Sequence, residues 1–264
     1  MGNFISRHRR HPLIAGMAKH CQRFLNRWHN LSYDFELNGE RFVLKRLAAS
    51  GLLRSAPVFD VGANIGQWSE VVKALEPAAQ IHAFEIVPDT FAKLQARVGR
   101  VTGIELNNQG LGARAGTITV HHFPQKPGLS STVPGSGGGR RDYVEIECPI
   151  IRGDDYMQRH AIPRLSFLKI DVEGGEPDVL AGFEAALSEQ RIAVIQFEYG
   201  KINISRRFLL ADFYALFARH GYAVGKIYPN YVDFRDYHID DEDFRGPNYL
   251  ALAPDAQYAM NLLR

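Results

Sequence analysis

The stretch VFDVGANIG, residues 58–66, decides the fold of this chain. Its apolar start is typical of a buried strand, and it runs directly into a turn with glycine at positions 62 and 66. A helical pattern, WSEVVKALE, follows at residues 68–76. Glycine tolerates a positive φ and lets the backbone come close to a ligand. Strand, glycine turn and helix in this order predict an open α/β sheet that binds a ligand at the carboxyl end of the strand.

Most of the chain repeats this alternation of apolar runs and helical stretches. Such a rhythm requires a mostly parallel sheet with helices on both faces, so the predicted fold class is α/β, doubly wound. NYLAL (248–252) predicts a closing strand, and we expect a sheet of seven strands with the last one antiparallel. The predicted strands are 57–62, 80–86, 103–110, 165–172 and 192–199, and the predicted helices are 68–76, 88–98, 176–190 and 207–221.

Three stretches depart from the rhythm. Residues 111–150 read as two extended strands, GTITVHHF and YVEIECPI, around a mobile loop at 125–142 that is rich in Gly, Ser and Pro. Asn38-Gly39 between two half-apolar runs predicts a hairpin before a helix. We expect an N-terminal extension over residues 1–50 and one main domain over 51–264.

Bulk composition excludes several classes of protein. The 264 residues carry a net charge of +2, which is too small to indicate a nucleic-acid partner. The two cysteines, Cys21 and Cys148, lie far apart, which excludes a disulfide scaffold or a cysteine-zinc cluster and fits a reducing compartment. No apolar run approaches the roughly 20 residues that a membrane span needs, and PLIAGMA (12–18) is short for a signal peptide. We therefore expect a cytoplasmic protein.

The first 33 residues hold no acid. One interpretation is a basic amphipathic segment that makes a weak contact with an acidic membrane surface through residues 1–30, or that binds an anionic substrate. The other is a solvated helix that packs on the main domain. We favour the second, because the apolar positions look few and the basic residues look spread over several faces. The basic residues are Arg7, Arg9, Arg10, Lys19, Arg23 and Arg27.

Two cofactor classes use a glycine turn of this kind. A dinucleotide fingerprint needs glycine at relative positions 1, 3 and 6, and counting from Gly62 places Asn64 and Gln67 at the second and third of these. The spacing acid-x-Gly-x-x-x-Gly, from Asp60 through Gly62 to Gly66, instead resembles the first motif of doubly wound methyltransferases that use S-adenosylmethionine.

The acids at the strand ends suit this second class. Asp60 offers a negative charge to the ammonium of the methionine part, directly or through water. Glu85, at the end of the next strand, can accept both ribose hydroxyls, as an acid does in nucleotide sites. The third strand ends in polar amides, among them Asn108, which suit an adenine edge.

A longer string carries a family resemblance. FLKIDVEGGEPDVLAGF (167–183), together with DVGANIG (60–66) and FEIVPDTFAKL (84–94), resembles the FkbM family of methyltransferases over about residues 57–252. The resemblance implies a class I methyltransferase fold, S-adenosylmethionine as cofactor, and methyl transfer to a hydroxyl of a sugar, a glycan or a polyketide-like product. QGLGAR (109–114) departs from the family pattern, so the adenine contacts are less defined. The cofactor positions carried over are Asp60, Gly62, Ala63, Asn64, Gly66 and Glu85, and the strand-four signature falls on Lys169, Asp171, Glu173 and Gly174.

Methylation of a hydroxyl needs a group that takes its proton. Candidates lie at the carboxyl ends of strands four and five: Asp171, Glu173 and Glu198. One carboxylate can act as general base, or Asp171 and Glu198 can bind Mg²⁺, which prefers oxygen ligands. The spacing does not choose between these roles. A structural alternative for Glu173 is to cap the next helix, whose first turn begins at Glu176-Pro177.

Other functions are weighed against this one. Nitrogen methyltransferases of this fold usually carry an Asn/Asp-Pro-Pro-aromatic turn at strand four, which KIDVEGG lacks. A binding module without activity would be signalled by damage to Asp60, Gly62 or Glu85, and all three are intact. Two sets of side chains could reach a ligand, the hydroxyls of Ser130, Ser131 and Thr132 in the loop and the rings of Tyr228, Tyr231, Phe234 and Tyr237 near the C-terminus. The acceptor and the oligomeric state cannot be read from the sequence.

Overall fold

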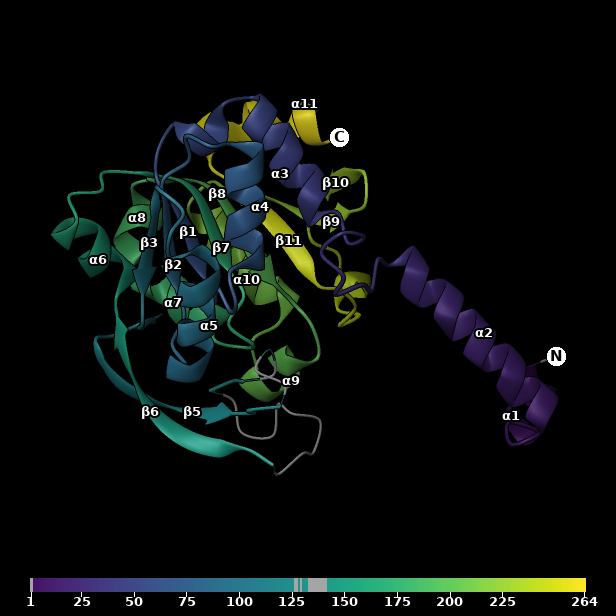
Figure 1. The fold of residues 1–264 in the computed structure, drawn as a ribbon. Helices are drawn as coiled ribbons and strands as arrows, with labels where there is room; N and C mark the ends of the chain where they lie inside the picture. Colours follow the sequence, from purple (N-terminus) through teal and green to yellow (C-terminus); the bar gives the residue numbers. More distant parts are fainter. Residues whose placement is uncertain (1, 126–127, 129, 133–141) are drawn as a thin grey trace.

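The computed structural model describes residues 2–125, 128, 130–132 and 142–264. Its body is one eight-stranded sheet in the order β10-β9-β11-β8-β7-β1-β2-β3, with helices against both faces (Figure 1). The strands are β1 (Val58–Val61), β2 (Ile81–Phe84), β3 (Ile104–Asn107), β7 (Leu165–Ile170), β8 (Ile192–Glu198), β9 (Ala223–Tyr228), β10 (Tyr231–Phe234) and β11 (Asn248–Leu252).

Strands β3, β2, β1, β7 and β8 run parallel, and β11 lies antiparallel between β8 and β9. The predicted fold class and the antiparallel closing strand are confirmed. The predicted count of seven strands is one too low, because β10 pairs with β9 at the edge. The aromatic residues near the C-terminus form part of a hairpin of β9 and β10. In this hairpin the rings of Tyr228 and Tyr231 stack, with their centroids 4.8 Å apart.

The central strands are buried on both faces, since helices cover each side. β1 and β7 contain no exposed residue, and Phe59 and Phe167 are fully buried. The principal helices are α3 (Glu40–Ala49), α4 (Gln67–Leu75), α5 (Pro88–Val98), α6 (Gly153–Arg159), α7 (Glu176–Gly182), α8 (Glu184–Ser188), α9 (Ile202–Arg206), α10 (Leu210–Arg219) and α11 (Met260–Leu263). The single helix predicted over 176–190 is two short helices that meet at Phe183.

A second, three-stranded sheet interrupts the α/β order. It comprises β4 (Gly110–Leu111), β5 (Gly116–His122) and β6 (Val144–Ile151), in the order β4-β6-β5. The two extended strands predicted between 111 and 150 are therefore confirmed. Most of the predicted mobile loop at 125–142 lies outside the described residues.

The predicted hairpin at Asn38-Gly39 is wrong. Gly39 takes a φ of +99° and starts α3, while the Asn38 side chain accepts a hydrogen bond from the Glu40 backbone N–H. Asn-Gly favours positive φ, and here that conformation begins a helix instead of a two-residue hairpin turn. Val43 and Leu44 of α3 are fully buried in the main core, so α3 packs with the domain although we placed it in the extension.

The extension proper stands away from the body. It comprises α1 (Gly2–Arg7) and α2 (Pro12–Trp28), which projects from one side of the molecule (Figure 1). No residue of α2 is buried, so the favoured expectation of a helix packed on the domain is wrong. Among the described residues, no helix combines the length and apolar character that crossing a membrane requires.

The joint that follows α2 is held against the body by contacts of His29 and Asn30. The Asn30 side chain donates hydrogen bonds to the backbone oxygens of Asn38 and Ile227, at 2.7 and 2.9 Å. His29 Nδ1 lies 3.1 Å from the Asp243 carboxylate. The helix therefore leaves the domain from a fixed point.

Candidate functional site

A cavity of about 460 Å³ opens at the carboxyl ends of β1, β2 and β7. This is the edge of an open α/β sheet at which ligands bind, and the volume is within the range of small-molecule sites. One wall carries Gly62, Asn64 and Glu85, and the opposite wall carries Asp171 and Glu173. The second sheet and residues 130–132 of the loop close the remaining side.

The glycine turn shapes the first wall. Gly62 takes a φ of +81°, and a Cβ built there would lie 1.9 Å from the carbonyl oxygen of Asp171. Only glycine fits a backbone that approaches its neighbour so closely. Asn64 follows with a φ of 49°, and its side-chain oxygen is buried without a hydrogen-bond partner among the described residues.

Glu85 is held in place by the backbone around it. One carboxylate oxygen accepts the Asn64 N–H at 2.9 Å, and the other accepts the Val87 N–H at 2.9 Å. Each oxygen keeps a lone pair that points to no described donor, since a carboxylate has about four acceptor positions. Burial raises the pKa of Glu85, and the two backbone hydrogen bonds oppose that rise. The carboxylate is therefore oriented before a ligand arrives.

Asp60 lies behind the wall and not on it. Its carboxylate is fully buried, accepts a hydrogen bond from the Ser69 hydroxyl at 2.7 Å, and lies 3.3 Å from Lys169 Nζ. Lys169 also lies 3.2 Å from Asp171, so one buried ammonium links two carboxylates. Burial alone would lower the pKa of Lys169, but the carboxylates of Asp171, Asp60 and Glu40 raise it well above its usual range.

Three other predicted cofactor residues also lie outside the cavity lining. Ala63 is buried, and its N–H bonds to the Phe84 carbonyl at 2.9 Å. Gly66 starts α4 with a φ of +86°, where a Cβ would meet Leu94 at 2.7 Å. The Asn108 side chain donates to the Glu85 backbone oxygen at 2.8 Å. In this geometry all three support the wall, and their contact with a cofactor stays a prediction.

The three predicted catalytic carboxyls are brought together. Asp171, Glu173 and Glu198 each offer an oxygen, and these oxygens lie within 4.8 Å of one another. Asp171 and Glu173 line the cavity, whereas Glu198, the last residue of β8, lies beside it and is partly exposed. The parallel strands β7 and β8 are neighbours, so their carboxyl ends meet at one edge.

Burial and the neighbouring acids favour the protonated forms of Glu173 and Glu198. Burial, followed by the charges of Asp171 and Glu176, raises the pKa of Glu173 to about 8. Burial and the charges of Asp171 and Glu173 raise the pKa of Glu198 well above its usual value. A site of this kind holds protons near neutral pH and releases them when a cation or a proton acceptor arrives.

The loop that carries Glu173 is held by Glu176. Glu176 Oε1 accepts the backbone N–H groups of Val172 and Gly174, at 3.1 and 3.2 Å. Helix α7 begins after Gly175 with no side-chain cap hydrogen bond, so the alternative in which Glu173 caps this helix is wrong. Glu173 adopts a φ of 53°, a strained conformation for a residue with a side chain. The Ser131 hydroxyl donates a hydrogen bond to the backbone carbonyl oxygen of Glu173 at 2.5 Å, which holds residues 130–132 against this wall.

Tyr33 is a residue that the sequence did not indicate. Its hydroxyl lies 3.8 Å from the point where a Cβ on Gly200 would lie, just beyond Glu198. No local motif marks it, because it comes from the joint after α2, more than 160 positions before Glu198.

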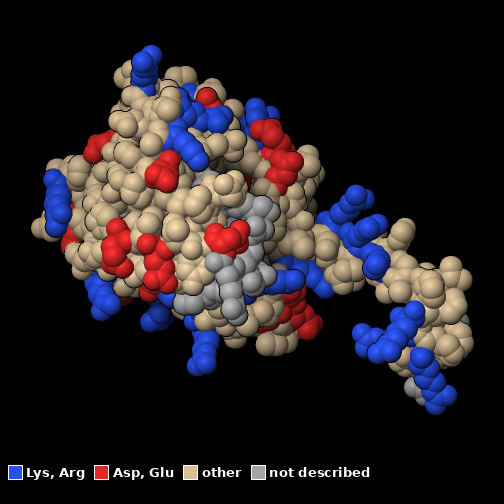
Figure 2. Space-filling model, turned by 60° about the horizontal axis from the view of Figure 1, so that its bottom comes forward, with Lys and Arg blue, Asp and Glu red and all other residues tan. Residues whose placement is uncertain are grey.

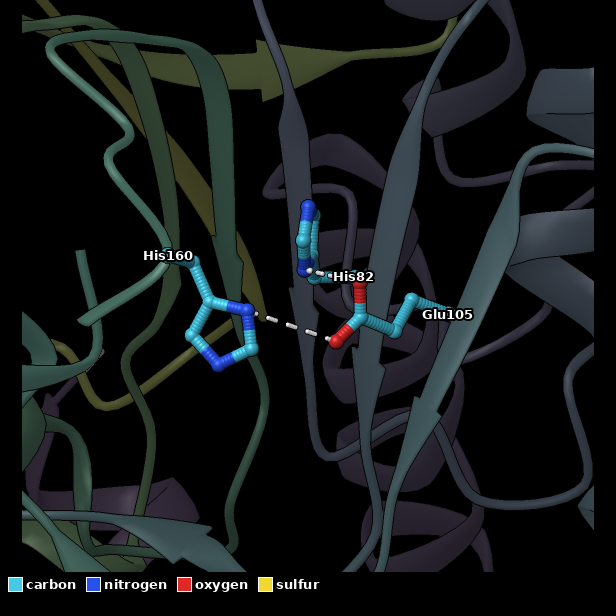
Figure 3. Close-up of side chains that lie close together, drawn as sticks. All are labelled: His82, Glu105 and His160. Atoms are coloured by element: carbon cyan, nitrogen blue, oxygen red, sulfur yellow. Dashed lines mark ion pairs between the residues drawn. The ribbon is translucent and has the colours of Figure 1, made fainter.

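Another cluster of titratable groups lies away from this cavity. Figure 3 shows His82, Glu105 and His160 facing one another from β2, β3 and the end of α6. The His82 and His160 Nδ1 atoms lie 3.4 and 3.5 Å from the Glu105 carboxylate. The Tyr156 hydroxyl bonds to His82 Nδ1 at 2.9 Å. None of these four residues lines the cavity, so the cluster is separate from the predicted chemistry.

The cavity fits a nucleoside cofactor on its own geometry. Gly62 admits no side chain, because a Cβ there would collide with the backbone of Asp171, and Asn64 brings a buried oxygen that has no described partner. Glu85 presents acceptors to a pair of hydroxyls. Apolar side chains from both sheets complete the lining: Phe84, Ile86, Val87, Leu111, Ile118 and Ile150.

Comparison with known proteins adds a family. A family model described as the Methyltransferase FkbM domain matches residues 60–224, more than half of the chain. The chain is 27% identical over 193 residues to the hexuronic acid methyltransferase AglP of Haloferax volcanii. The matched region covers 72% of this chain and 76% of that protein. It is 30% identical over 194 residues to the 31-O-demethyl-FK506 methyltransferase FkbM of Streptomyces tacrolimicus, with 63% and 72% covered.

A third relative is matched over a shorter region. The chain is 28% identical over 144 residues to Methyltransferase 1 of Beauveria bassiana, which covers 48% of this chain. The chain spans only 58% of that protein's length.

Proposed function

The chain belongs to the FkbM family of methyltransferases, and on that premise we propose that it transfers the methyl group of S-adenosylmethionine to a hydroxyl oxygen of a sugar or glycosylated acceptor. One observation carries the proposal: a single cavity joins Glu85, held by two backbone N–H groups, to the carboxyls of Asp171 and Glu173. The first side suits a ribose, and the second suits a hydroxyl that must lose a proton.

The first wall would hold the cofactor. Glu85 would accept the ribose hydroxyls, the turn at Gly62 would lie against the methionine part, and Asn64 would offer its buried oxygen as an acceptor. Asp60 would act through Lys169, since its own carboxylate is buried. The bound cofactor supplies an activated methyl group on a positively charged sulfur.

The second wall would position and deprotonate the acceptor. A carboxylate of this wall would hold the acceptor hydroxyl in line with the methyl group that the cofactor supplies, and it would take the hydroxyl proton as the methyl group is transferred. Orientation of the two reacting atoms contributes about 7–11 kcal/mol in such sites. Glu173 suits the role of base because its raised pKa, about 8, makes its ionised form a stronger proton acceptor than an ordinary glutamate.

A bound Mg²⁺ is a second way to use the same carboxyls. The three oxygens within 4.8 Å offer the type of ligand that this ion prefers. Asp171 and Glu198 would then hold the ion, which would lower the pKa of the acceptor hydroxyl. The raised pKa values of Glu173 and Glu198 fit both roles, since a cation bound between the same carboxyls would hold them ionised.

The acceptor class comes from the relatives. One is named for a hexuronic acid and another for a demethylated natural product with a free oxygen. Both are acceptors rich in hydroxyls. A polyketide-like acceptor is the alternative substrate, and a protein that binds the cofactor without catalysis is the alternative function.

Calorimetric titration with S-adenosylhomocysteine tests the cofactor wall first. Wild type should bind in the micromolar range, and Glu85→Ala should lose most of the affinity. Methyl transfer from labelled cofactor to free hexuronic acids, glycosides and macrolides, with and without Mg²⁺ and chelator, then tests the acceptor wall. A methylated oxygen in the product supports the proposal, whereas a methylated nitrogen or carbon contradicts it.

The proposed roles of the two walls can be contradicted separately. If folded wild-type protein does not bind S-adenosylhomocysteine, the methyltransferase mechanism is wrong. Binding without transfer to any of the acceptors would favour a binding module. If methyl transfer stops in chelator and returns with Mg²⁺, the role of lowering the hydroxyl pKa would belong to an ion held by Asp171 and Glu198, and Glu173 would not be the proposed base.

A further inference from the structure

The helix α2 carries an apolar face that nothing in the described structure covers. The exposed fractions of Leu13, Met17, Phe24 and Trp28 lie between 66 and 72%. An isolated helix of 17 residues is marginal in water, and most helices in proteins are stabilised by packing of such a face. The exposed apolar side chains on one helix therefore indicate that something outside the described structure packs against them.

The two kinds of side chain are sorted on opposite sides of α2. At about 100° per residue, the apolar side chains fall within an arc of about 140°. Lys19, Arg23 and Arg27 fall within about 80° on the other side of the helix. Our expectation that the basic residues spread over several faces is therefore wrong for the helix as it forms. The apolar arc contains Leu13, Phe24, Met17, Trp28, Cys21, Ile14, Leu25 and Ala18.

Positive charge continues beyond this helix. Arg7, Arg9 and Arg10 lie in α1 and the turn after it, and the first acid of the chain is Asp34. Figure 2 shows the projecting arm with blue side chains, whereas red side chains lie on the body. The arm thus combines an apolar face with an unbalanced positive charge.

We propose that α2 docks the protein on the surface of an anionic lipid membrane, with its axis along the surface. A basic amphipathic helix places its apolar side about 5–10 Å into the boundary of headgroups and acyl chains, while its basic side chains reach the phosphates. Trp28 suits this depth because its ring is apolar and its N–H is polar. Since no described helix can cross a bilayer, the contact is peripheral.

Two other occupants fit the arm less well. A second copy of α2 packed on the apolar arc would leave Lys19, Arg23 and Arg27 of both chains on the outer sides of the pair, with no acid in residues 1–33 to pair with them. An acidic protein would match the charge, but it would also need an apolar groove beside the acids. A membrane that contains anionic lipid supplies negative charge and apolar depth at one surface.

Trp28 provides a direct probe of this contact. The chain has two tryptophans, and Trp68 is buried in the core with 5% of its surface exposed. Titration of the full chain with vesicles of phosphatidylcholine containing 30% phosphatidylglycerol should shift the Trp28 emission to the blue. Pure phosphatidylcholine vesicles should give little shift, and high salt should weaken the response. The variant Trp68→Phe, if it folds, leaves Trp28 as the sole emitter.

Charge-matched variants separate the arm from the general charge of the protein. Lys19→Gln/Arg23→Gln/Arg27→Gln should weaken binding to the anionic vesicles about 100-fold, since each basic residue near the surface contributes about a factor of five. Lys45→Gln/Lys93→Gln/Arg100→Gln removes the same charge from exposed positions on the body and should change binding less than threefold. Met17→Ser/Phe24→Ser keeps every charge and should weaken binding at least tenfold.

Four outcomes would overturn the proposal. The first is no sedimentation of wild type with the anionic vesicles. The second is equal weakening by the arm and body charge variants, which would indicate a nonspecific charge effect. The third is tighter binding to polyglutamate than to the vesicles with no blue shift of Trp28, which would favour an acidic protein partner. A concentration-dependent dimer that the Met17→Ser/Phe24→Ser variant abolishes, without vesicle binding, would assign the face to a second copy.

Discussion

The two walls of the cavity are built in different ways, although both present carboxyl groups. On the wall proposed for the cofactor, Glu85 is fixed by two backbone N–H groups, which oppose the rise in its pKa that burial causes. On the opposite wall, Asp171, Glu173 and Glu198 crowd one another, and the charges of neighbouring acids add to the effect of burial in raising the pKa values of both glutamates. The difference teaches that a carboxyl held by the backbone suits the proposed recognition of hydroxyls, whereas carboxyls tuned by their neighbours suit the proposed proton transfer.

The largest expected effect comes from the point where the two walls touch. Gly62→Ala places a Cβ 1.9 Å from the Asp171 carbonyl oxygen, in a backbone with a φ of +81°. We expect the free energy of unfolding to fall by about 3 kcal/mol or more, from strain and overpacking together. Thermal unfolding measures the loss, and titration with S-adenosylhomocysteine should detect no binding.

The helix α2 offers a matched control for this change. Gly16→Ala adds the same methyl group in a place with no neighbour within 4 Å, and the helix lies outside the core. Its unfolding midpoint should equal that of wild type. If Gly62→Ala matches it, the two walls do not meet as tightly as the structure indicates.

A second substitution affects only the wall that carries Asp171 and Glu173. Glu173→Gln should lower kcat about 10²- to 10⁴-fold, the usual contribution of a general base, and leave the affinity for S-adenosylhomocysteine within about twofold of wild type. Steady-state kinetics with the acceptor found by screening measures the first, and calorimetry the second. Glu184→Gln, an exposed glutamate on α8, controls for the loss of a charge. A variant that loses cofactor affinity and keeps kcat would reverse the proposed roles of the walls.

The pH profile tests the same group without a substitution. A base must be ionised, and burial and neighbouring acids raise the pKa of Glu173 to about 8. We therefore expect kcat/KM to rise with pH up to about 8 and then to level off, and Glu173→Gln to lose this rise. If a Mg²⁺ ion held the carboxyls ionised, the rise would move to lower pH in its presence and return with chelator. A profile that is flat from pH 5 to 9 for wild type would exclude Glu173 as the base.

Glu85→Gln probes the cofactor wall with a smaller expected effect. The amide keeps one oxygen but turns an NH₂ group toward one of the two backbone N–H donors. We expect the affinity for S-adenosylhomocysteine to fall about 10- to 100-fold, since a hydrogen bond to a charged group contributes about 1.5–3 kcal/mol. Calorimetry at one pH measures this change. Affinity equal to that of wild type would show that Glu85 does not hold the ribose.

The smallest effect lies outside both walls, at His82. Burial lowers the pKa of His82, partly offset by Glu105, so the unfolded chain binds more protons than the folded one just below pH 6.5. Stability contributed by neutral His82 is thus present above pH 6.5 and is lost as the pH falls from there toward its lower folded pKa. We expect the free energy of unfolding to fall over this pH range in wild type, and to depend less on pH in His82→Gln. Denaturant unfolding at pH 7.5 and 5.5 measures it, and an unchanged pH slope in the variant would contradict it.

Local signals in the sequence predicted most of the body. The strand, the turn at residues 62–66 and the following helix form because apolar runs and glycines act over a few positions. Glu85, Asp171 and Glu173 meet because carboxyl ends of parallel strands share an edge, and this geometry follows from the alternation of elements alone. The roles assigned to these residues stay predictions.

Contacts that depend on register or on distant segments could not be predicted. The Lys169 link between Asp60 and Asp171 requires β1 and β7 to pair so that Asp60 lies opposite Lys169. Tyr33 comes close to Gly200, just beyond Glu198, through the course of the joint after α2, which no periodicity encodes. An apolar stripe on a helix likewise indicates that a partner covers it, but it does not identify that partner.

The place of β11 in the sheet has a consequence for how the chain is made. This strand follows β9 and β10 in the chain, yet it lies between β8 and β9. During synthesis β9 and β10 leave the ribosome before the strand that joins them to the sheet. Until Asn248–Leu252 arrive, the edge of β8 offers unpaired N–H and C=O groups to any other strand. We therefore expect nascent chains that stop before residue 248 to depend on chaperones and to aggregate readily.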